Sequence, residues 1–136
     1  MRVRLFAWLV GLTLLAATVS PAPAVAAPGQ PAPQIAIQFQ VHLLTPATLL
    51  VTVAAECAPW SGGNGFIVVA VEQPIAGTTT ATEGVGVSSV PCDGDTHDIT
   101  VNVQGGPFSL GDATAFAQIF AVVMGSDARK VLIVSP

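Results

Sequence analysis

The stretch TLLVTVAAEC, Thr48 to Cys57, decides the fold class of this chain. Apolar side chains occupy every second position of it, and the positions between them are mixed in character. Because successive side chains of a strand point to opposite faces, a period of two predicts a β-strand with one buried face. The valines favour the same structure, since β-branched side chains fit a pleated, half-buried surface. The buried face is expected to carry Leu49, Val51, Val53, Ala55 and Cys57.

Three further segments each predict one strand: Gln34–Leu44 and His97–Gln104 alternate in the same way, and Phe66–Gln73 is apolar almost throughout. In the last of these, Glu72 marks the even-numbered face as the outer one. The apolar residues of the opposite face are expected to fill the core. They are Ile35, Ile37, Phe39, Val41, Leu43, Ile67, Val69, Val71, Ile99, Val101 and Val103.

Three other segments predict strands from a weaker pattern. Ala81–Cys92 is loosened by Gly84 and Gly86, and Arg129–Pro136 closes the chain as a short strand. Ala113–Met124 is apolar and rich in alanine, so its composition also permits a helix. Helix start signals are thin there and every neighbouring segment is a strand, so a strand is the preferred interpretation and a helix the alternative.

The seven strands predict an all-β, seven-stranded antiparallel immunoglobulin-like sandwich over residues 34–136, because turn residues separate them at intervals typical of that architecture. We expect one domain without internal repeats. The signature residues of true immunoglobulin domains are missing: Trp60 lies in a Gly-rich loop, the chain has no tyrosine, and Val90 stands where the corner tyrosine would be. The prediction therefore concerns architecture alone.

Residues 1–26 have the layout of a secretory signal peptide. Arg2 and Arg4 form a basic start, Leu5–Val19 is apolar, and small residues follow up to Ala26. The apolar stretch is shorter than the roughly 20 residues that a membrane span needs, so an uncleaved anchor is the weaker alternative. We expect cleavage after Ala26 and a secreted, extracellular protein.

The mature chain begins with a Pro-rich lead-in, residues 27–33, and is strongly acidic. Arg129 and Lys130 stand against eight acids, so the net charge of the mature chain is −6. Such a charge repels nucleic acids and anionic lipid surfaces. No apolar run of spanning length follows the signal, so we expect neither a nucleic-acid partner nor a membrane span in the mature chain.

Cys57 and Cys92 are the two cysteines of the chain. In an exported protein such a pair is expected to form a disulfide, because the compartment is oxidising. On a chain-entropy estimate, closing a loop of this length stabilises the fold by about 4 kcal/mol. Two free thiols that bind a metal are the alternative.

The stretch PCDGDTHDITVNV, Pro91 to Val103, raises the question of a metal site just ahead of a strand. Asp93, Asp95 and Asp98 could supply oxygens to a cation, but their spacing does not match a calcium-binding loop. His97 has few possible partners for a transition metal once the thiols are oxidised. Asp-Gly is instead a strong hairpin-turn signal. We therefore expect a turn, with no metal and no cofactor.

No residue is marked as catalytic by its surroundings in the sequence. The G-x-S-x-G nucleophile motif is absent, and His42 and His97 both fall on outward strand positions. The Gly-rich segment APWSGGNG lacks the lysine and the following helix of a phosphate-binding loop. We expect a protein without catalytic activity.

Trp60 is a possible partner contact, since exposed aromatic side chains on loops often anchor partners. A cap over the disulfide is the alternative. The disulfide would bring Trp60 to the same end of the sandwich as Asp93 and Asp95, which are further possible contacts. Phe108 would then lie at the opposite end.

In four motifs the chain resembles small secreted actinobacterial immunoglobulin-like β-sandwich proteins of unknown function. The motifs are LLVTVAAECAP, VVAVEQ, PCDGDTHDITVNV and GPFSLGDATAFAQ, and they fall within residues 48–124. They belong to the framework of the fold. The resemblance therefore implies the fold and export, and it implies no activity.

The expected function is that of an exported, non-catalytic protein that binds another protein or a component of the cell envelope. One alternative is a small secreted hydrolase, which would hold His42 or His97 in a pocket beside a serine and an acid. The other is a carrier of an apolar small molecule, which would have an apolar cavity that opens at one end.

Overall fold

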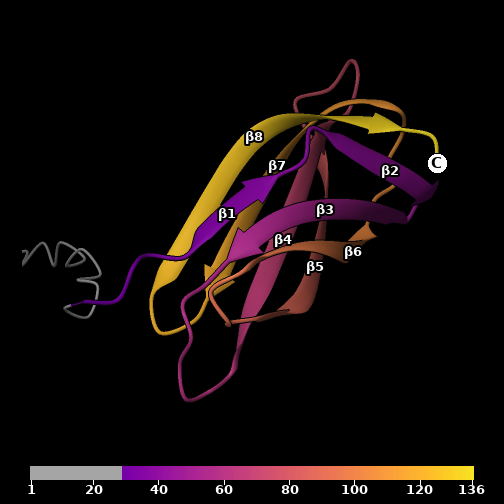
Figure 1. Cartoon of the computed structure of the whole chain (residues 1–136). Helices are drawn as coiled ribbons and strands as arrows, with labels where there is room; N and C mark the ends of the chain where they lie inside the picture. Colours follow the sequence, from indigo (N-terminus) through magenta and orange to yellow (C-terminus); the bar gives the residue numbers. More distant parts are fainter. Residues whose placement is uncertain (1–28) are drawn as a thin grey trace, which may run out of the picture.

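The computed structural model describes residues 29–136, which form eight β-strands (Figure 1). The predicted signal peptide, residues 1–26, lies outside the described residues, as do the first two residues of the lead-in. Across the described part of the chain, no helix is long and apolar enough to cross a membrane. In chain order the strands are β1 (Gln34–Ile37), β2 (Gln40–Thr45), β3 (Thr48–Glu56), β4 (Asn64–Pro74), β5 (Ala81–Pro91), β6 (Thr96–Gly105), β7 (Gly111–Phe120) and β8 (Met124–Val134).

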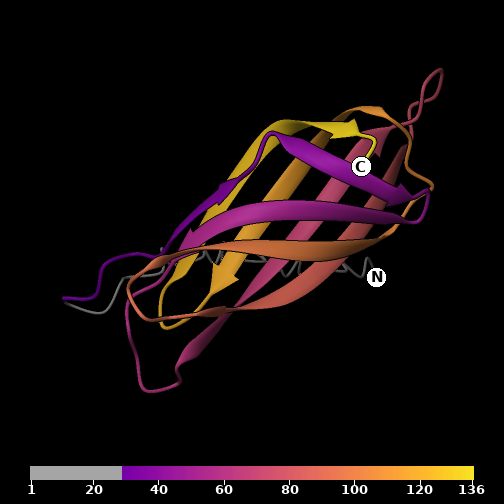
Figure 2. The ribbon, with the colours of Figure 1, turned by 45° about the vertical axis from the view of Figure 1, so that its right-hand side comes forward.

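The strands form one hydrogen-bonded sheet that closes on itself. Their order is β1-β3-β2-β8-β7-β4-β5-β6, and β6 pairs back with β3. Neighbours run antiparallel except β2 and β8, which run parallel. The barrel is flattened, so that β2, β3 and β6 cross in front of β8, β7, β4 and β5 (Figure 2). The all-β class is confirmed, but the predicted antiparallel sandwich is wrong. Seven of the eight strands, β2 to β8, close into a barrel with mixed strand directions, and β1 is added at β3.

The additional strand arises because the predicted first strand breaks at Gln38 and Phe39. Between β1 and β2 the register with β3 shifts by two residues, which forms a bulge, while the N–H of Gln38 still donates to the Thr52 carbonyl of β3 at 2.9 Å. The bulge directs β2 towards β8, where the N–H of Leu132 donates to the Phe39 carbonyl at 2.9 Å. Phe39 was predicted to lie in the core, and this is wrong: the bulge turns its side chain outward, and it is 59% exposed.

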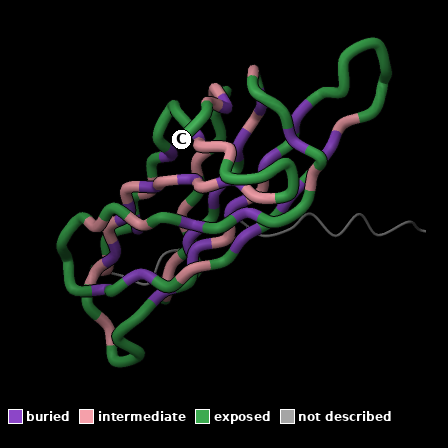
Figure 3. The backbone as a smooth tube through the Cα atoms, turned by 90° about the vertical axis from the view of Figure 1, so that its right-hand side faces the viewer, coloured by how far each residue is buried: buried purple, intermediate pink, exposed green. Residues whose placement is uncertain are grey.

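The core lies between the two layers and follows the predicted alternation (Figure 3). Along β3 and β4 every second residue is buried, as the period of two requires. Most of the other predicted core residues are buried as well, namely Ile37, Val41, Val101 and Val103. Three are partly buried and pack against this core, namely Ile35, Leu43 and Ile99.

The alanine-rich segment forms a strand, as preferred over a helix. β7 lies between β4 and β8 and is hydrogen-bonded to both, so neighbouring strands satisfy its backbone. Its burial also alternates, with Ala113, Ala115, Ala117 and Ile119 on the inner side. The strand ends at Phe120, so the last residues of the predicted segment form the turn into β8.

The barrel closes at one corner, where β5 meets β6. The two strands pair at only two positions, Gly84 with Gly105 and Val85 with Gln104. The inward positions Gly84 and Gly86 lie directly against the backbone of β6. The glycines that weaken the strand pattern in the sequence are therefore the residues that let two backbones approach closely here.

Candidate functional site

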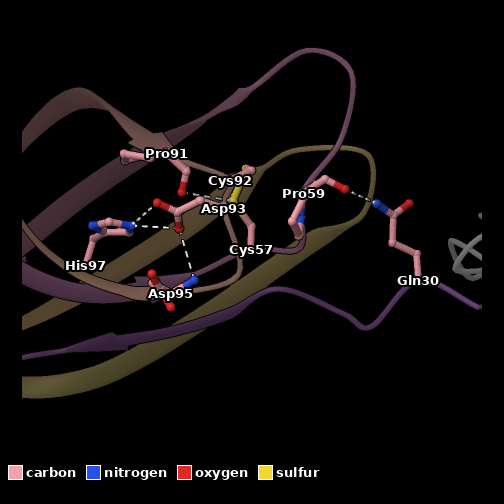
Figure 4. Close-up of a disulfide and its surroundings, with 8 residues drawn as sticks. All are labelled: Gln30, Cys57, Pro59, Pro91, Cys92, Asp93, Asp95 and His97. Atoms are coloured by element: carbon pink, nitrogen blue, oxygen red, sulfur yellow. Dashed lines mark hydrogen bonds and ion pairs between the residues drawn. A yellow bond between two sulfur atoms is a disulfide. The ribbon is translucent and has the colours of Figure 1, made fainter.

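One end of the barrel is held by the predicted disulfide (Figure 4). Cys57 and Cys92 are bonded, with their Cα atoms 4.7 Å apart, which confirms the pairing. Beside the bond, the N–H of Gly94 donates to the carbonyl of Cys57 at 3.0 Å. The loop after β3 and the turn before β6 thus lie together, as predicted. We call residues 57–63 and 92–95 the disulfide end.

The acidic stretch before β6 is a turn from β5 into β6, built around Asp93. The predicted hairpin pairing is not formed beside it, because β5 and β6 pair only near Gly84 and Gly105. One carboxylate oxygen of Asp93 accepts the N–H of Asp95 at 3.0 Å, and His97 Nε2 lies 2.9 and 3.0 Å from the two oxygens. Gly94 has a φ of 90°, a conformation that glycine adopts without strain. The hydrogen bond from His97, followed by that from the Asp95 N–H, lowers the pKa of the Asp93 carboxyl. Both acids are exposed at the disulfide end, and the expected turn is confirmed.

These contacts make the stability of the turn sensitive to acid. A carboxyl with a lowered pKa in the folded chain stabilises the fold above its unfolded pKa, and this contribution is lost as the pH falls through the folded pKa. We expect Asp93→Asn to be less stable than the wild type at pH 7, and the difference to shrink below about pH 4. Urea unfolding of both proteins at a series of pH values from 7 to 2.5 measures this difference in the free energy of unfolding. Asp95→Asn is the control for the loss of one charge. A difference that persists unchanged in acid would contradict the assignment.

Trp60 lies at the disulfide end as a half-buried cap. Its side chain packs against the hydrophobic core, and its ring covers the backbone of Gly62. The indole Nε1 is buried and lacks a hydrogen-bond partner among the described residues. These contacts favour the structural interpretation of Trp60. A role of Trp60, Asp93 or Asp95 in partner contact stays a prediction.

The two histidines lie in different surroundings, and neither is part of a nucleophilic site in residues 29–136. His97 contacts Asp93, whereas His42 Nδ1 lies 3.4 Å from the backbone carbonyl of Ser135. In this part of the chain, no serine hydroxyl is hydrogen-bonded to either ring. Nor do three metal-ligating side chains converge within the same residues. The geometry expected of a small hydrolase is therefore not found there.

The opposite end of the barrel carries Phe108, as predicted, with its N–H donating to the Pro46 carbonyl at 2.7 Å. Gln73 is buried there, and its amide donates to the Ser109 carbonyl and accepts the Ser109 N–H, both at 2.9 Å. A hollow of about 320 Å³ lies beside this clamp, and its walls are mixed: Gln73 and Asp112 line it together with Ile75 and Leu110.

An apolar surface that was not predicted from the sequence covers the outer side of β5, β4, β7 and β8. Directly paired residues of antiparallel strands share a face, so the pairings define rows across the four strands. Nine of the twelve side chains in three successive rows are apolar, and we call these rows the outer apolar face. The rows are Ser89-Phe66-Phe120-Met124, Val87-Val68-Gln118-Ser126 and Val85-Ala70-Phe116-Ala128.

Large side chains of the outer apolar face are exposed, Phe116 and Phe120 less so than the others, at 43% and 38%. Phe66 is 58% exposed, Val87 62% and Met124 55%. A hollow of about 410 Å³ lies on the same face beside Phe116. One signal of this face was present in the sequence: FIVVAV, Phe66–Val71, is apolar throughout, and such a run is typical of a strand covered on both sides.

Comparisons with known proteins bring no relative to this fold. The chain matches no protein-family model, and no curated protein sequence or solved structure is significantly similar to it. The resemblance to secreted actinobacterial proteins thus rests on the motifs of the sequence and stays a prediction.

Proposed function

We propose that this chain is an exported interaction protein without catalytic activity, and that it binds its partner through the outer apolar face. The observation that supports this most directly is the continuous exposure of large apolar side chains on four adjacent strands. Exposed apolar patches of this kind mark interaction surfaces in soluble proteins.

The fold itself does not require the outer apolar face. The inner side chains of the same strands already fill the core, and Val69 and Ile119 are 0% exposed. Threonine would form an equally good strand at the outer positions, since it shares the β preference of valine and phenylalanine. A partner that covers the face gains about 25 cal/mol for each Å² of apolar surface removed from water.

Export is supported by the disulfide and by the signal-like N-terminal sequence. Disulfides persist in oxidising compartments, so the Cys57–Cys92 bond is compatible with an extracellular location. The partner is then a protein or an envelope component with an apolar surface of its own. Because this chain is itself acidic, a nucleic acid is an unsuitable partner.

We expect Phe66→Thr to reduce partner capture at least tenfold, because a hot-spot aromatic residue contributes about 2 kcal/mol or more. The matched control is Phe39→Thr, since Phe39 is 59% exposed but lies outside the outer apolar face. The tagged chain is incubated with culture supernatant, with solubilised cell-wall fractions and with untagged copies of itself. Captured material is quantified for each variant.

A third variant, Asp95→Asn, tests the disulfide end in the same assay. Loss of capture with Asp95→Asn, but not with Phe66→Thr, would move the binding surface to the disulfide end. Equal losses with Phe66→Thr and Phe39→Thr would show a general effect of apolar exposure. Absence of capture from every fraction would contradict the proposed function.

A further inference from the structure

A row of charged side chains borders the outer apolar face towards its Phe108 end. This fourth row continues the pairings across the strands and consists of Glu83, Glu72, Thr114 and Lys130. The acids lie on β5 and β4, and the base lies on β8, so the row carries opposite charges at its two sides. Lys130 is the only lysine of the chain.

Within one chain these charges lack partners. Glu72 and Glu83 are directly opposite each other, and like charges in such a pair repel. Among residues 29–136 the salt bridges involve other side chains, so neither the two acids nor Lys130 is paired. The row therefore offers unpaired charge of both signs at the edge of an apolar surface.

We propose that the partner of the outer apolar face is a second copy of this chain, related by a two-fold axis that runs parallel to the strands between β4 and β7. This inference rests on the proposed function and names its partner. Such an axis reverses the strand order but keeps each row at its level. β8 then lies over β5 of the partner, and β7 lies over its β4.

The charged row becomes complementary in this arrangement. Lys130 of one copy faces the partner's Glu83, and the symmetric contact forms on the other side. The two acids that repel each other within one chain thereby gain a cation from the second copy. Opposite charges that meet at the rim of an interface fix its register and discourage other registers.

The shapes of the apolar rows also match. Val85 and Val87 of β5 project from the face, with 54% and 62% of their surface exposed. The residues facing them across the axis are Ala128 and Ser126, which are small and border the hollow of about 410 Å³. The valines of one copy can thus enter the hollow of the other, as the side chains of two facing sheets interdigitate.

The other aligned arrangement is disfavoured by charge. A two-fold axis perpendicular to the strands would place β5 over β5 and would reverse the order of the rows. Lys130 would then face the level of Met124, and Glu83 the level of Ser89. Both charges would be covered without a partner, which costs free energy.

The size of the contact predicts a moderate affinity. Four strands at about 4.8 Å spacing and four rows at about 6.7 Å spacing cover about 500 Å² in projection. Standard specific interfaces bury about 800 Å² on each partner, so this pair falls at the lower end of the range. We expect a dissociation constant on the order of micromolar.

The arrangement has a consequence for the disulfide end. Because the axis runs along the strands, both disulfide ends lie on the same side of the pair. Each pair would present Trp60, Asp93 and Asp95 twice towards one surface. A weak contact at this end would gain in avidity from the second copy.

Sedimentation equilibrium of protein produced from the full 136-residue sequence tests the inference. We expect a reversible dimer, with the dissociation constant raised at least tenfold by Phe66→Thr and about tenfold by Lys130→Glu. Phe39→Thr should leave the dissociation constant within about twofold of the wild-type value. Lys130→Glu combined with Glu83→Lys should restore it to within about threefold of that value. Circular dichroism and thermal melts establish that each variant is folded.

A carbodiimide cross-link provides a second measurement that does not depend on variants. In a mixture of ¹⁴N- and ¹⁵N-labelled chains, we expect mixed-isotope peptides that join Lys130 to Glu83 or Glu72. A wild-type chain that stays monomeric at high concentration overturns the inference, as does a dimer whose cross-links avoid these residues. A dimer insensitive to Phe66→Thr also overturns the inference, because the copies then associate through another surface. The proposed function stands in any of these cases if another component is still captured through Phe66, and it fails if Phe66→Thr leaves all capture unchanged.

Discussion

Replacement of both cysteines by alanine is expected to lower the free energy of unfolding by about 4 kcal/mol. The bond closes a loop with a sequence separation of 35, and on the chain-entropy estimate its loss frees the unfolded chain by that amount. Cys57 and Cys92 are only 2% and 4% exposed, so alanine also leaves small cavities in the core. For a domain of this size, the melting temperature should fall by about 15 to 25 °C.

Guanidinium unfolding without reductant measures this effect, with reduced wild-type protein as the matched control. The reduced wild type retains both sulfurs, so it separates the loss of the bond from the loss of packing. We expect the reduced wild type to be slightly more stable than the double variant. If the free energy of unfolding of the double variant lies within about 1 kcal/mol of that of the oxidised wild type, the bond constrains the unfolded chain very little.

The strands of the core could be predicted because their signal is local. In β3 and β4 the period of two in the sequence is the period of burial in the structure. The cysteine pair then linked two strand ends, which placed Trp60 with Asp93 and left Phe108 at the other end. These predictions needed only the alternation, the disulfide and the direction of antiparallel strands.

The closed barrel could not be predicted in the same way, because it depends on contacts between distant parts of the chain. Gln38 and Phe39 continue the apolar alternation in the sequence, so nothing local marks the bulge that separates β1 from β2. The parallel pairing of β2 with β8 joins the two ends of the described chain. Burial against a distant strand, and not local preference, decides such a pairing.

The outer apolar face was missed for a related reason. The residues of the acidic stretch before β6 are neighbours in the sequence, so a possible site there could be recognised as a single motif. The face instead combines residues such as Phe66, Val87 and Phe116 from separate strands. Only the registers of β4 with β5 and β7, and of β7 with β8, bring them into common rows.

The closure of the barrel depends on β5 approaching β6 without side chains between them. A Cβ atom at Gly86 would overlap the carbonyl oxygen of Asn102, and it would lie 2.8 Å from both the Asn102 carbonyl carbon and Val101 Cγ1. A Cβ at Gly84 would meet the ring of Phe108 at 2.8 Å and the Gln104 carbonyl oxygen at 2.9 Å. The closest clash at Gly86 is with backbone and is the tighter of the two, whereas the nearest atom at Gly84 belongs to the Phe108 side chain.

Gly86→Ala is therefore expected to destabilise the fold by about 3 kcal/mol or more, at the upper end of the cost of overpacking. The added methyl group forces β6 away from β5, and because the two strands pair at only two positions, the closure opens there. Gly84→Ala should lower the free energy of unfolding by a smaller amount, about 1 to 2 kcal/mol, since its closest contact, 2.8 Å, is less severe than that at Gly86. Urea unfolding compares both variants with Val85→Ala, which shortens an outward side chain of the same strand. If the free energy of unfolding of Gly86→Ala is within about 1 kcal/mol of the wild-type value, the close approach of β5 and β6 does not hold the barrel closed.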